Sequence, residues 1–203
     1  MLPRLLPMLA VPAEPFDASE YSFEIKWDGI RALAAVDASG WRIWGRERAD
    51  YTVRYPEFDM LRCLPTGTLV DGELVAFDPQ GRPDLPRLLR RHGLADPWRI
   101  AQAKRWCPVR CVVFDLLYHA GRCLLNEPLA RRRELMAEIV ERLHVPEVIF
   151  SAEVVGAGTA LCATALAQGH EGVMAKRLSS TYRPGRRSPP WRKIKPKRRP
   201  RSE

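Results

Sequence analysis

The sequence predicts an α+β domain built on antiparallel β-sheets flanked by helices. Its 203 residues, 46% of them hydrophobic, suffice for one sizeable core but not comfortably for two. Several segments alternate apolar and polar residues and are joined by short turns, which is typical of hairpins. Helical periodicity is confined to two short segments. We therefore expect a single domain with mixed strands and few helices.

The first predicted strand spans residues 21–27, where polar and apolar side chains alternate. Its apolar face carries Tyr21, Phe23, Ile25 and Trp27. Its polar face carries Glu24 and Lys26, just before an Asp-Gly turn. Segments 30–36 and 41–44 follow as a hairpin across a short turn at residues 37–40. Lys26 is therefore expected at the edge of a sheet, within reach of a ligand.

The remaining elements follow from the same patterns. Residues 68–77 are predicted as a strand that places Asp71 and Glu73 on one face. Residues 109–118 are nearly all apolar, which favours a strand buried on both sides. Helices are predicted at 131–143 and 159–168, and final strands at 171–177 and 191–195. A loop rich in proline, glycine and arginine is expected at 182–190.

The formal net charge of +9 comes from one end of the chain. Residues 183–203 hold 10 of the 33 lysines and arginines and 1 of the 24 acids, so residues 1–182 hold 23 of each and are neutral. This distribution indicates either a polyanionic partner near that end or a solvated basic tail. Composition does not choose between the two.

Five cysteines form an odd set without a Cys-x-x-Cys pair, which argues against a disulfide framework and a structural zinc site. We expect buried thiols in a reducing cytoplasm. Prolines interrupt the apolar N-terminus before a signal-peptide core forms, and no apolar run approaches membrane length. The sequence therefore predicts a cytoplasmic protein without a membrane partner.

Lysine is scarce in this chain, which has 27 arginines and 6 lysines. Arginine stays protonated in proteins, whereas a lysine in a cationic or desolvated site can become a free amine and a nucleophile. Lys26 is therefore a candidate nucleophile, although an ordinary solvated lysine is the better explanation of this position when it is taken alone.

Three further lysines sharpen the hypothesis. Lys193 and Lys195 fall on one face of a predicted strand, and Lys176 ends another. In one cleft with Lys26, these cations would bind a polyphosphate and lower the pKa of Lys26 by repulsion.

Three carboxylates are candidates to hold a divalent ion against the same phosphates: Asp71, Glu73 and Glu171. Alternation along the strand places Glu171 on the opposite face from Lys176, unless Gly172 forms a bulge or Glu171 lies before the paired part of the strand. Ordinary hydrogen-bonded carboxylates at strand ends remain the alternative.

Five ordered motifs resemble those of ATP-dependent DNA ligases. Residues 24–31 contain Lys-x-Asp-Gly, the nucleotidyl-transfer motif, and Asp71-Gly-Glu73 resembles the third motif. Segment 113–117 resembles the strand with an adenine-stacking aromatic, 171–176 the fourth motif and 191–195 the fifth. Coverage runs from about residue 7 to residue 196. A single Lys-x-Asp-Gly is weak, but five motifs in order are a specific signal.

The resemblance implies a ligase-type nucleotidyltransferase fold, similar to ATP-grasp domains, that uses ATP and Mg²⁺ or Mn²⁺. It implies that Lys26 attacks the α-phosphate, expels pyrophosphate and holds AMP as a phosphoramidate. AMP then passes to a DNA 5′-phosphate, and the nick is sealed in repair or recombination.

The other roles are carried over in the same way. Glu24 would read the adenine edge, and Phe114 would stack on the base, although core packing is its default role. Arg31 and Arg46 would contact ribose or phosphate, and Glu73 the ribose or the metal. Glu171 would help to place the metal. The phosphoryl charge would be stabilised by Lys176, Lys193 and Lys195.

The chain departs from the family pattern in places. Residues 1–196 resemble the adenylylation domain, and 197–203 form a basic tail too short for the OB-fold that usually follows. Residues 45–48, Gly-Arg-Glu-Arg, replace a usual Ser-Arg-x-Gly, which alters the loop around Arg46.

Three readings remain open. The first, which we favour, is a minimal or split ligase that acts on nicked DNA with an OB-fold or repair protein supplied by another chain. The others are a non-catalytic ATP- or DNA-binding accessory module, and an RNA ligase or capping-type nucleotidyltransferase.

Overall fold

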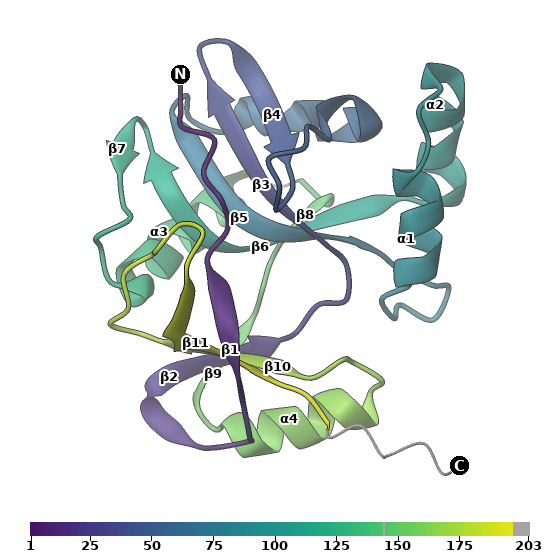
Figure 1. Cartoon of the computed structure of the whole chain (residues 1–203). Coiled ribbons are helices and arrows are strands. Elements are labelled where there is room, and N and C mark those ends of the chain that lie inside the picture. Colours follow the sequence, from purple (N-terminus) through teal and green to yellow (C-terminus); the bar gives the residue numbers. More distant parts are fainter. Residues whose placement is uncertain (144, 197–203) are drawn as a thin grey trace.

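The computed structural model describes residues 1–143 and 145–196 and confirms the α+β class. In this part of the chain, two sheets lie one above the other (Figure 1). The smaller has the order β1-β11-β10-β2-β9; the larger has β4-β3-β5-β6-β7, with β8 beside β6. All strand pairs are antiparallel except β1 with β11 and β6 with β8.

The smaller sheet comprises β1 (Leu9–Ala13), β2 (Ala18–Ile25), β9 (Glu153–Gly156), β10 (Val173–Arg177) and β11 (Arg187–Ile194). The larger sheet comprises β3 (Ile30–Asp37), β4 (Gly40–Trp44), β5 (Thr68–Ala76), β6 (Val109–His119), β7 (Arg122–Cys123) and β8 (Val148–Phe150). The helices are α1 (Leu85–His92), α2 (Pro97–Trp106), α3 (Leu129–Leu143), α4 (Gly158–Ala167) and the short 3₁₀ segments η1 (Thr52–Arg54) and η2 (Pro56–Cys63). The predicted hairpin, the two predicted helices and the predicted strands all form, with boundaries shifted by a few residues.

The hydrophobic core lies in three clusters separated by the sheets. The largest packs the outer face of the larger sheet against η2, α1 and α3 and includes Phe58, Leu74 and Met136. A second cluster, with Phe114 and Trp191, packs between the sheets and occupies part of that space. A third packs α4 against the smaller sheet (Figure 1). Both sheets are therefore anchored on their outer faces, which leaves their inner faces to form a pocket.

Prolines hide three of the elements that escape the sequence prediction. The described helices α1 and α2 carry Pro86 and Pro97 in their first turns, where proline is tolerated. Asp84 and Asp96 cap these helices. Each carboxylate accepts a hydrogen bond from the backbone N–H of the third residue of its helix, at 2.9 and 2.8 Å. The third element is β1, an apolar segment interrupted by Pro12.

The predicted loop at 182–190 is shorter than expected because β11 begins at Arg187 and contains two prolines. The ladder with β1 is interrupted there: Ala10 pairs with Ser188, and the next pair joins Val11 to Arg192. Proline lacks the N–H that a ladder requires, so a bulge accommodates both prolines without breaking the strand.

The cysteine prediction was partly wrong. All five cysteines are free thiols, but Cys63 and Cys123 are exposed, whereas Cys107, Cys111 and Cys162 are buried. Both exposed residues lie at the ends of short elements, where alternation says little about burial. No helix in the described ranges is long and apolar enough to span a membrane. The predicted basic tail, 197–203, lies outside the described residues.

Candidate active site

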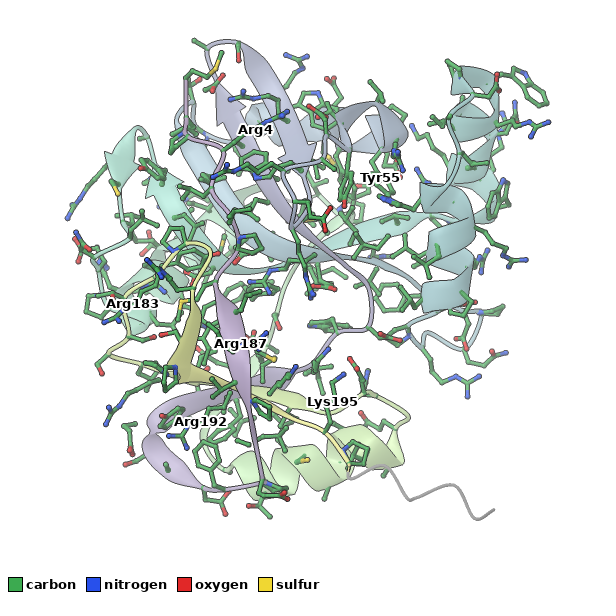
Figure 2. The ribbon with its side chains drawn as sticks, in the orientation of Figure 1. Arg4, Tyr55, Arg183, Arg187, Arg192 and Lys195 are labelled. Carbon is green, nitrogen blue, oxygen red and sulfur yellow. The ribbon has the colours of Figure 1, made fainter. Side chains whose placement is uncertain are left out.

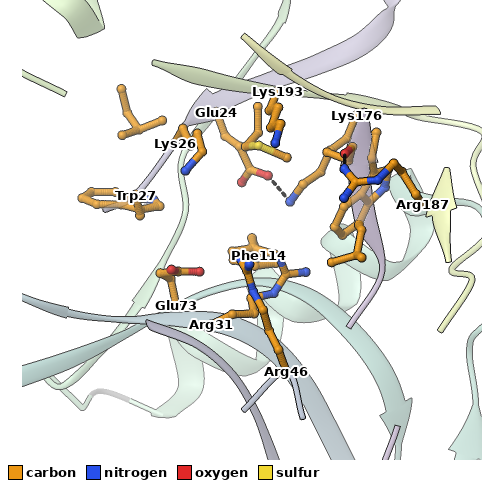
Figure 3. A pocket seen from close by; sticks show the side chains of 15 residues that line it. Glu24, Lys26, Trp27, Arg31, Arg46, Glu73, Phe114, Lys176, Arg187 and Lys193 are labelled. Atoms are coloured by element: carbon orange, nitrogen blue, oxygen red, sulfur yellow. Dashed lines mark hydrogen bonds and ion pairs between the residues drawn. The ribbon is translucent and has the colours of Figure 1, made fainter. Parts of the chain in front are cut away.

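A pocket opens between the inner faces of the two sheets (Figure 3). Strands β2, β10 and β11 supply one wall, and β3, β5 and β6 supply the other. Among the predicted site residues, its lining includes Glu24, Lys26, Arg31, Arg46, Glu73, Phe114, Lys176 and Lys193. The structure therefore brings together eight of the eleven residues that the sequence singled out. Glu171 and Lys195 do not line the pocket, but both contact its edge through ion pairs.

Lys26 lies one residue beyond the end of β2, on the face predicted by alternation. Its backbone N–H donates to the carbonyl of Gly172 at 2.9 Å, which fixes it beside β10. The glycine of the Lys-x-Asp-Gly motif is needed for a close approach, because a Cβ on Gly29 would lie 2.1 Å from the carbonyl oxygen of Leu74. The turn after Lys26 is thereby pressed against β5 of the opposite wall.

The pKa of Lys26 is lowered from its ordinary value, chiefly because burial penalises the ammonium. Repulsion from Arg46 and Arg31 lowers it further, whereas Glu73 and Asp28 act in the opposite direction. The direction agrees with the prediction. The chief cause is burial, however, and not repulsion from the neighbouring lysines.

Two of those lysines are neutralised by carboxylates. Lys176 forms an ion pair with Glu24, and both side chains are 2% exposed. Lys195 forms an ion pair with Glu171, which also contacts the ammonium of Lys26. Paired charges of this kind repel a third cation weakly.

Glu171 reaches Lys26 because it precedes the β10 ladder, which begins at Val173. Gly172 between them has φ +145°, and a Cβ there would lie 2.0 Å from the carbonyl oxygen of Ile194. Of the two arrangements that parity allowed, the structure shows that Glu171 lies ahead of the ladder. Only glycine is accommodated at position 172.

Arg31 is fixed by the larger sheet. Its Nε and Nη2 donate to the two carboxylate oxygens of Asp71, each at 2.6 Å, and its Nη2 also donates to the carbonyl of Met8 at 3.3 Å. The hydroxyl of Tyr182 donates to the same carboxylate at 2.6 Å. Asp71 is fully buried and outside the pocket lining, so it is not available to a metal ion as the sequence suggested. Its role is to orient Arg31.

Glu73 lies on the opposite wall from Lys26 (Figure 3). Burial raises its pKa to about 7, although Arg31, Lys26 and Arg46 pull it down. No group of three or more His, Cys, Asp or Glu side chains within the described ranges is arranged to hold a metal ion.

Phe114 lies on β6, is 7% exposed and lines the pocket. The ammonium of Lys176 lies 4.0 Å from its ring centroid, and the guanidinium carbon of Arg31 lies 4.7 Å from it. These cation–π contacts join both walls of the pocket through one ring. Phe114 therefore combines the core position that is the default for an aromatic with access to the site.

Sequence reasoning missed three residues of the site. Trp27 was placed on the apolar face of its strand, but β2 ends at Ile25 and Trp27 lines the pocket, donating from its indole N–H to the hydroxyl of Ser151 at 3.1 Å. Arg187 also lines the pocket. Arg133 reaches Glu24 from α3. The sequence did contain a sign of this role. Arg133 falls on the same helix face as Leu129 and Met136, where a buried arginine requires partners.

Comparison with known proteins agrees with this geometry. The family model described as "ATP dependent DNA ligase domain" matches residues 7–195. The chain belongs to this family. A DNA ligase of Methanothrix thermoacetophila is 35% identical to the domain over 201 residues, covering 93% of this chain and 35% of the relative. The domain thus spans about a third of the length of that relative.

Solved structures agree with the family assignment. The ligase domain of Mycobacterium tuberculosis LigD superimposes on this domain with a TM-score of 0.78 and 31% identity, covering 94% of this chain and 60% of that one. A mycobacterial DNA ligase D complexed with ATP and MES gives a TM-score of 0.74 with the same identity and coverage. The ligase-type fold predicted from the sequence is confirmed.

Proposed function

We propose that this domain is the adenylylating part of an ATP-dependent DNA ligase and that Lys26 is its nucleophile. The observation that carries the proposal concerns the amine of Lys26. Its pKa is lowered, and it lies in a pocket that Arg46, Lys193 and Glu73 also line. Burial favours the free amine that nucleophilic attack requires. The relative complexed with ATP supports this nucleotide as the substrate.

In the proposed step, the lone pair of Lys26 Nζ attacks the α-phosphorus of ATP. An N–P bond forms, the bond from the α-phosphorus to the bridging oxygen breaks, and pyrophosphate leaves with that electron pair. The proton released from Nζ passes to water. Lys26 first has to separate from Glu171, whose carboxylate contacts it here. We expect Lys193 and Arg46 in the pocket lining, and Lys195 beside Glu171, to stabilise charge on the phosphate oxygens.

The proposal includes a divalent ion held jointly with the nucleotide. Mg²⁺ is usually bound by one or two carboxylates together with phosphates and water. The carboxylates that would hold it are Glu73 in the pocket lining and Glu171, which contacts Lys26 at the edge of the pocket. Mg²⁺ or Mn²⁺ would neutralise phosphate charge when bound. Glu73, with its pKa near 7, is suited to this role only when it is ionised.

The proposed second substrate is nicked DNA, whose 5′-phosphate would accept AMP. The described segment from 183 to 195 contains six basic residues and no acid: Arg183, Arg186, Arg187, Arg192, Lys193 and Lys195. Figure 2 shows Arg183, Arg187 and Arg192 on the same side of the molecule. Arg183 precedes β11, and the other two arginines lie on that strand. This surface suits salt-sensitive contacts with DNA phosphates.

The location and the partner complete the proposal. Five free thiols suit a cytoplasmic location. The partner predicted from the sequence, an OB-fold or repair protein on another chain, stays a prediction.

The adenylylation proposal is tested by incubating the protein with α-labelled ATP and Mg²⁺. We expect a covalent adduct in the unmodified chain and none in Lys26→Ala, with Lys104→Ala, a lysine on α2 outside the pocket, as the matched control. An adduct that persists in Lys26→Ala would overturn the assignment of the nucleophile. Labelled GTP in a parallel reaction tests the capping-type alternative.

The DNA proposal is tested by the salt dependence of binding to a nicked duplex. Replacing Arg183 and Arg186 together with glutamine should reduce the slope of log K against log salt by about 2 if each contacts one phosphate. Arg62→Gln, far away on η2, is the control. An unchanged slope in the double variant would exclude this surface from the DNA contact.

A further inference from the structure

Two adjacent arginines of α3 are buried side by side but have different partners. Arg132 and Arg133 share the inward helix face with Leu129 and Met136, and their side chains are 0% and 2% exposed. Buried guanidinium groups are costly unless they are paired and hydrogen-bonded. The partners of each arginine therefore indicate what it is there to hold.

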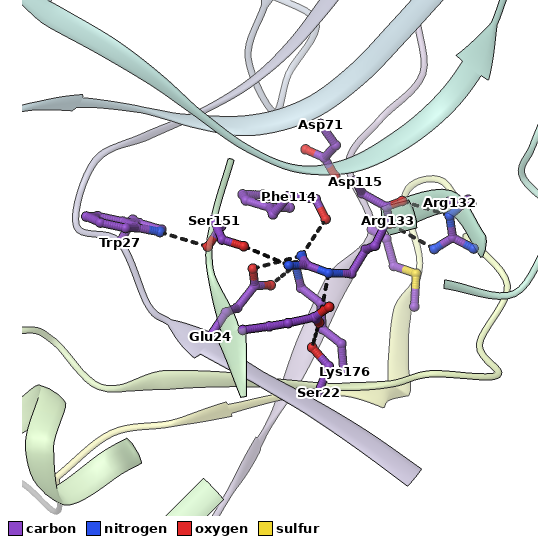
Figure 4. A network of polar contacts seen from close by, with 12 residues as sticks. Ser22, Glu24, Trp27, Asp71, Phe114, Asp115, Arg132, Arg133, Ser151 and Lys176 are labelled. Carbon is purple, nitrogen blue, oxygen red and sulfur yellow. Dashed lines mark hydrogen bonds and ion pairs between the residues drawn. The ribbon is translucent and has the colours of Figure 1, made fainter. Parts of the chain in front are cut away.

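Arg133 joins parts of the chain that build the pocket (Figure 4). Its Nη1 donates to a carboxylate oxygen of Glu24 at 3.2 Å and to the carbonyl of Phe114 at 3.1 Å. Its Nη2 donates to the carbonyl of Ser151 at 2.7 Å, and its Nε forms an ion pair with Glu153 at 2.8 Å. One rigid guanidinium thus fixes a carboxylate of β2 relative to the backbone that carries Phe114 on β6.

Glu24 is consequently held between two cations. Lys176 contacts one carboxylate oxygen and Arg133 the other, and Glu24 is 1% exposed. The carboxylate nevertheless lines the pocket, as Figure 3 shows. An ionised carboxylate only accepts hydrogen bonds, so the group presented to a ligand here is a fixed acceptor.

We propose that Arg133 is a positioning residue for nucleotide selection. By fixing the Glu24 carboxylate, it makes the pocket select a purine that carries a hydrogen-bond donor at position 6, as adenine does. Without Arg133, the carboxylate keeps Lys176 as its only cationic partner and loses the contact that fixes its second oxygen. This inference rests on the proposed function, because it deepens the choice of ATP as substrate.

Arg132 provides the matched control. It donates to both carboxylate oxygens of Asp115, at 2.7 and 2.8 Å, and to the carbonyls of Glu127 and Ser180 at 2.5 and 3.0 Å. None of these partners lines the pocket. A change at Arg132 therefore disturbs the same helix to a similar degree without releasing Glu24.

The experiment measures equilibrium binding by calorimetry for ATP and for purine riboside triphosphate, which differs from ATP only in lacking the 6-amino group. The unmodified chain should prefer ATP by about tenfold to a hundredfold, the range expected for one hydrogen bond to a charged acceptor. In Arg133→Met the preference should fall to about threefold or less, and Arg133→Lys should keep an intermediate value. Arg132→Lys should keep the preference of the unmodified chain. Thermal unfolding of each variant shows whether it is folded.

Two results would overturn the inference. One is an unchanged preference in folded Arg133→Met or Arg133→Lys; the other is an equal loss of preference in Arg132→Lys, which would reduce Arg133 to a structural role. Because binding is measured without the covalent step, the two proposals fail separately. A chain that prefers ATP in this assay but forms no adduct contradicts adenylylation and leaves the positioning role supported.

Discussion

The two ends of the pocket carry similar charges in different surroundings. At the inner end, defined by Glu24 and Lys176, both side chains are 2% exposed. At the outer end, defined by Lys26, Glu171 and Lys195, the side chains are 21%, 28% and 41% exposed. Burial makes the inner pair strong and fixed, whereas water weakens the outer pairs. A fixed inner end suits recognition of a base, and an outer end that exchanges partners suits chemistry on phosphates.

Lys176→Met is expected to have the largest effect, because it breaks the inner pair. Glu24 would remain buried with only Arg133 as a cationic partner, and the free energy of unfolding should fall by about 3–5 kcal/mol. Urea denaturation at neutral pH measures this change. A loss below about 1 kcal/mol would show that the inner end is no more rigid than the outer one.

Glu73→Gln extends the comparison to the opposite wall. Because the folded-state pKa is raised from 4.5 to about 7, the native protein binds the proton more tightly than the unfolded chain. The unmodified domain therefore loses stability as the pH rises from about 4.5 to about 7. Glutamine stays neutral at every pH. Across that window, the free energy of unfolding of the variant should therefore rise relative to that of the unmodified domain by on the order of 3 kcal/mol.

This gain is measured as the difference in urea-derived unfolding free energy at pH 5 and pH 8. Equal differences at both pH values would contradict a raised pKa for Glu73. The gain should be absent below about pH 4.5, where Glu73 is protonated in both states.

Lys195→Met tests the outer end and should have a small effect on stability. Its ion pair with Glu171 is partly exposed, so the free energy of unfolding should change by less than about 1 kcal/mol. The same substitution at Lys176 is the matched comparison. A loss as large as that of Lys176→Met would remove the distinction between the two ends.

Arg46→Gln is the subtlest change. Arg46 is exposed and lowers the pKa of Lys26 by repulsion, but burial is the larger cause. Its removal should therefore raise the pKa of Lys26 modestly and move the pH midpoint of adduct formation upward. The midpoint is read from the rate of lysyl-AMP formation between pH 6 and pH 10. A downward shift would contradict the repulsion.

Local sequence patterns predicted much of the site. Alternation along residues 21–27 placed Glu24 and Lys26 on one face, and the pocket confirms it. The same rule failed for Trp27, because alternation holds only while the strand continues and β2 ends at Ile25. Prolines concealed α1, α2 and β1, since the residue that usually breaks an element is tolerated at its start or in a bulge.

The sequence by itself determined the fold class, the order of the motifs and the shared face of Glu24 and Lys26, because the periods of strands and helices are local properties of the chain. Only the tertiary structure decided which charges meet. Arg133 reaches Glu24 across 109 residues of sequence, and Lys26 meets Glu171 across 145. Burial and long-range pairing set these partners and the direction in which the pKa of Lys26 moves, and neither can be read from spacing along the chain.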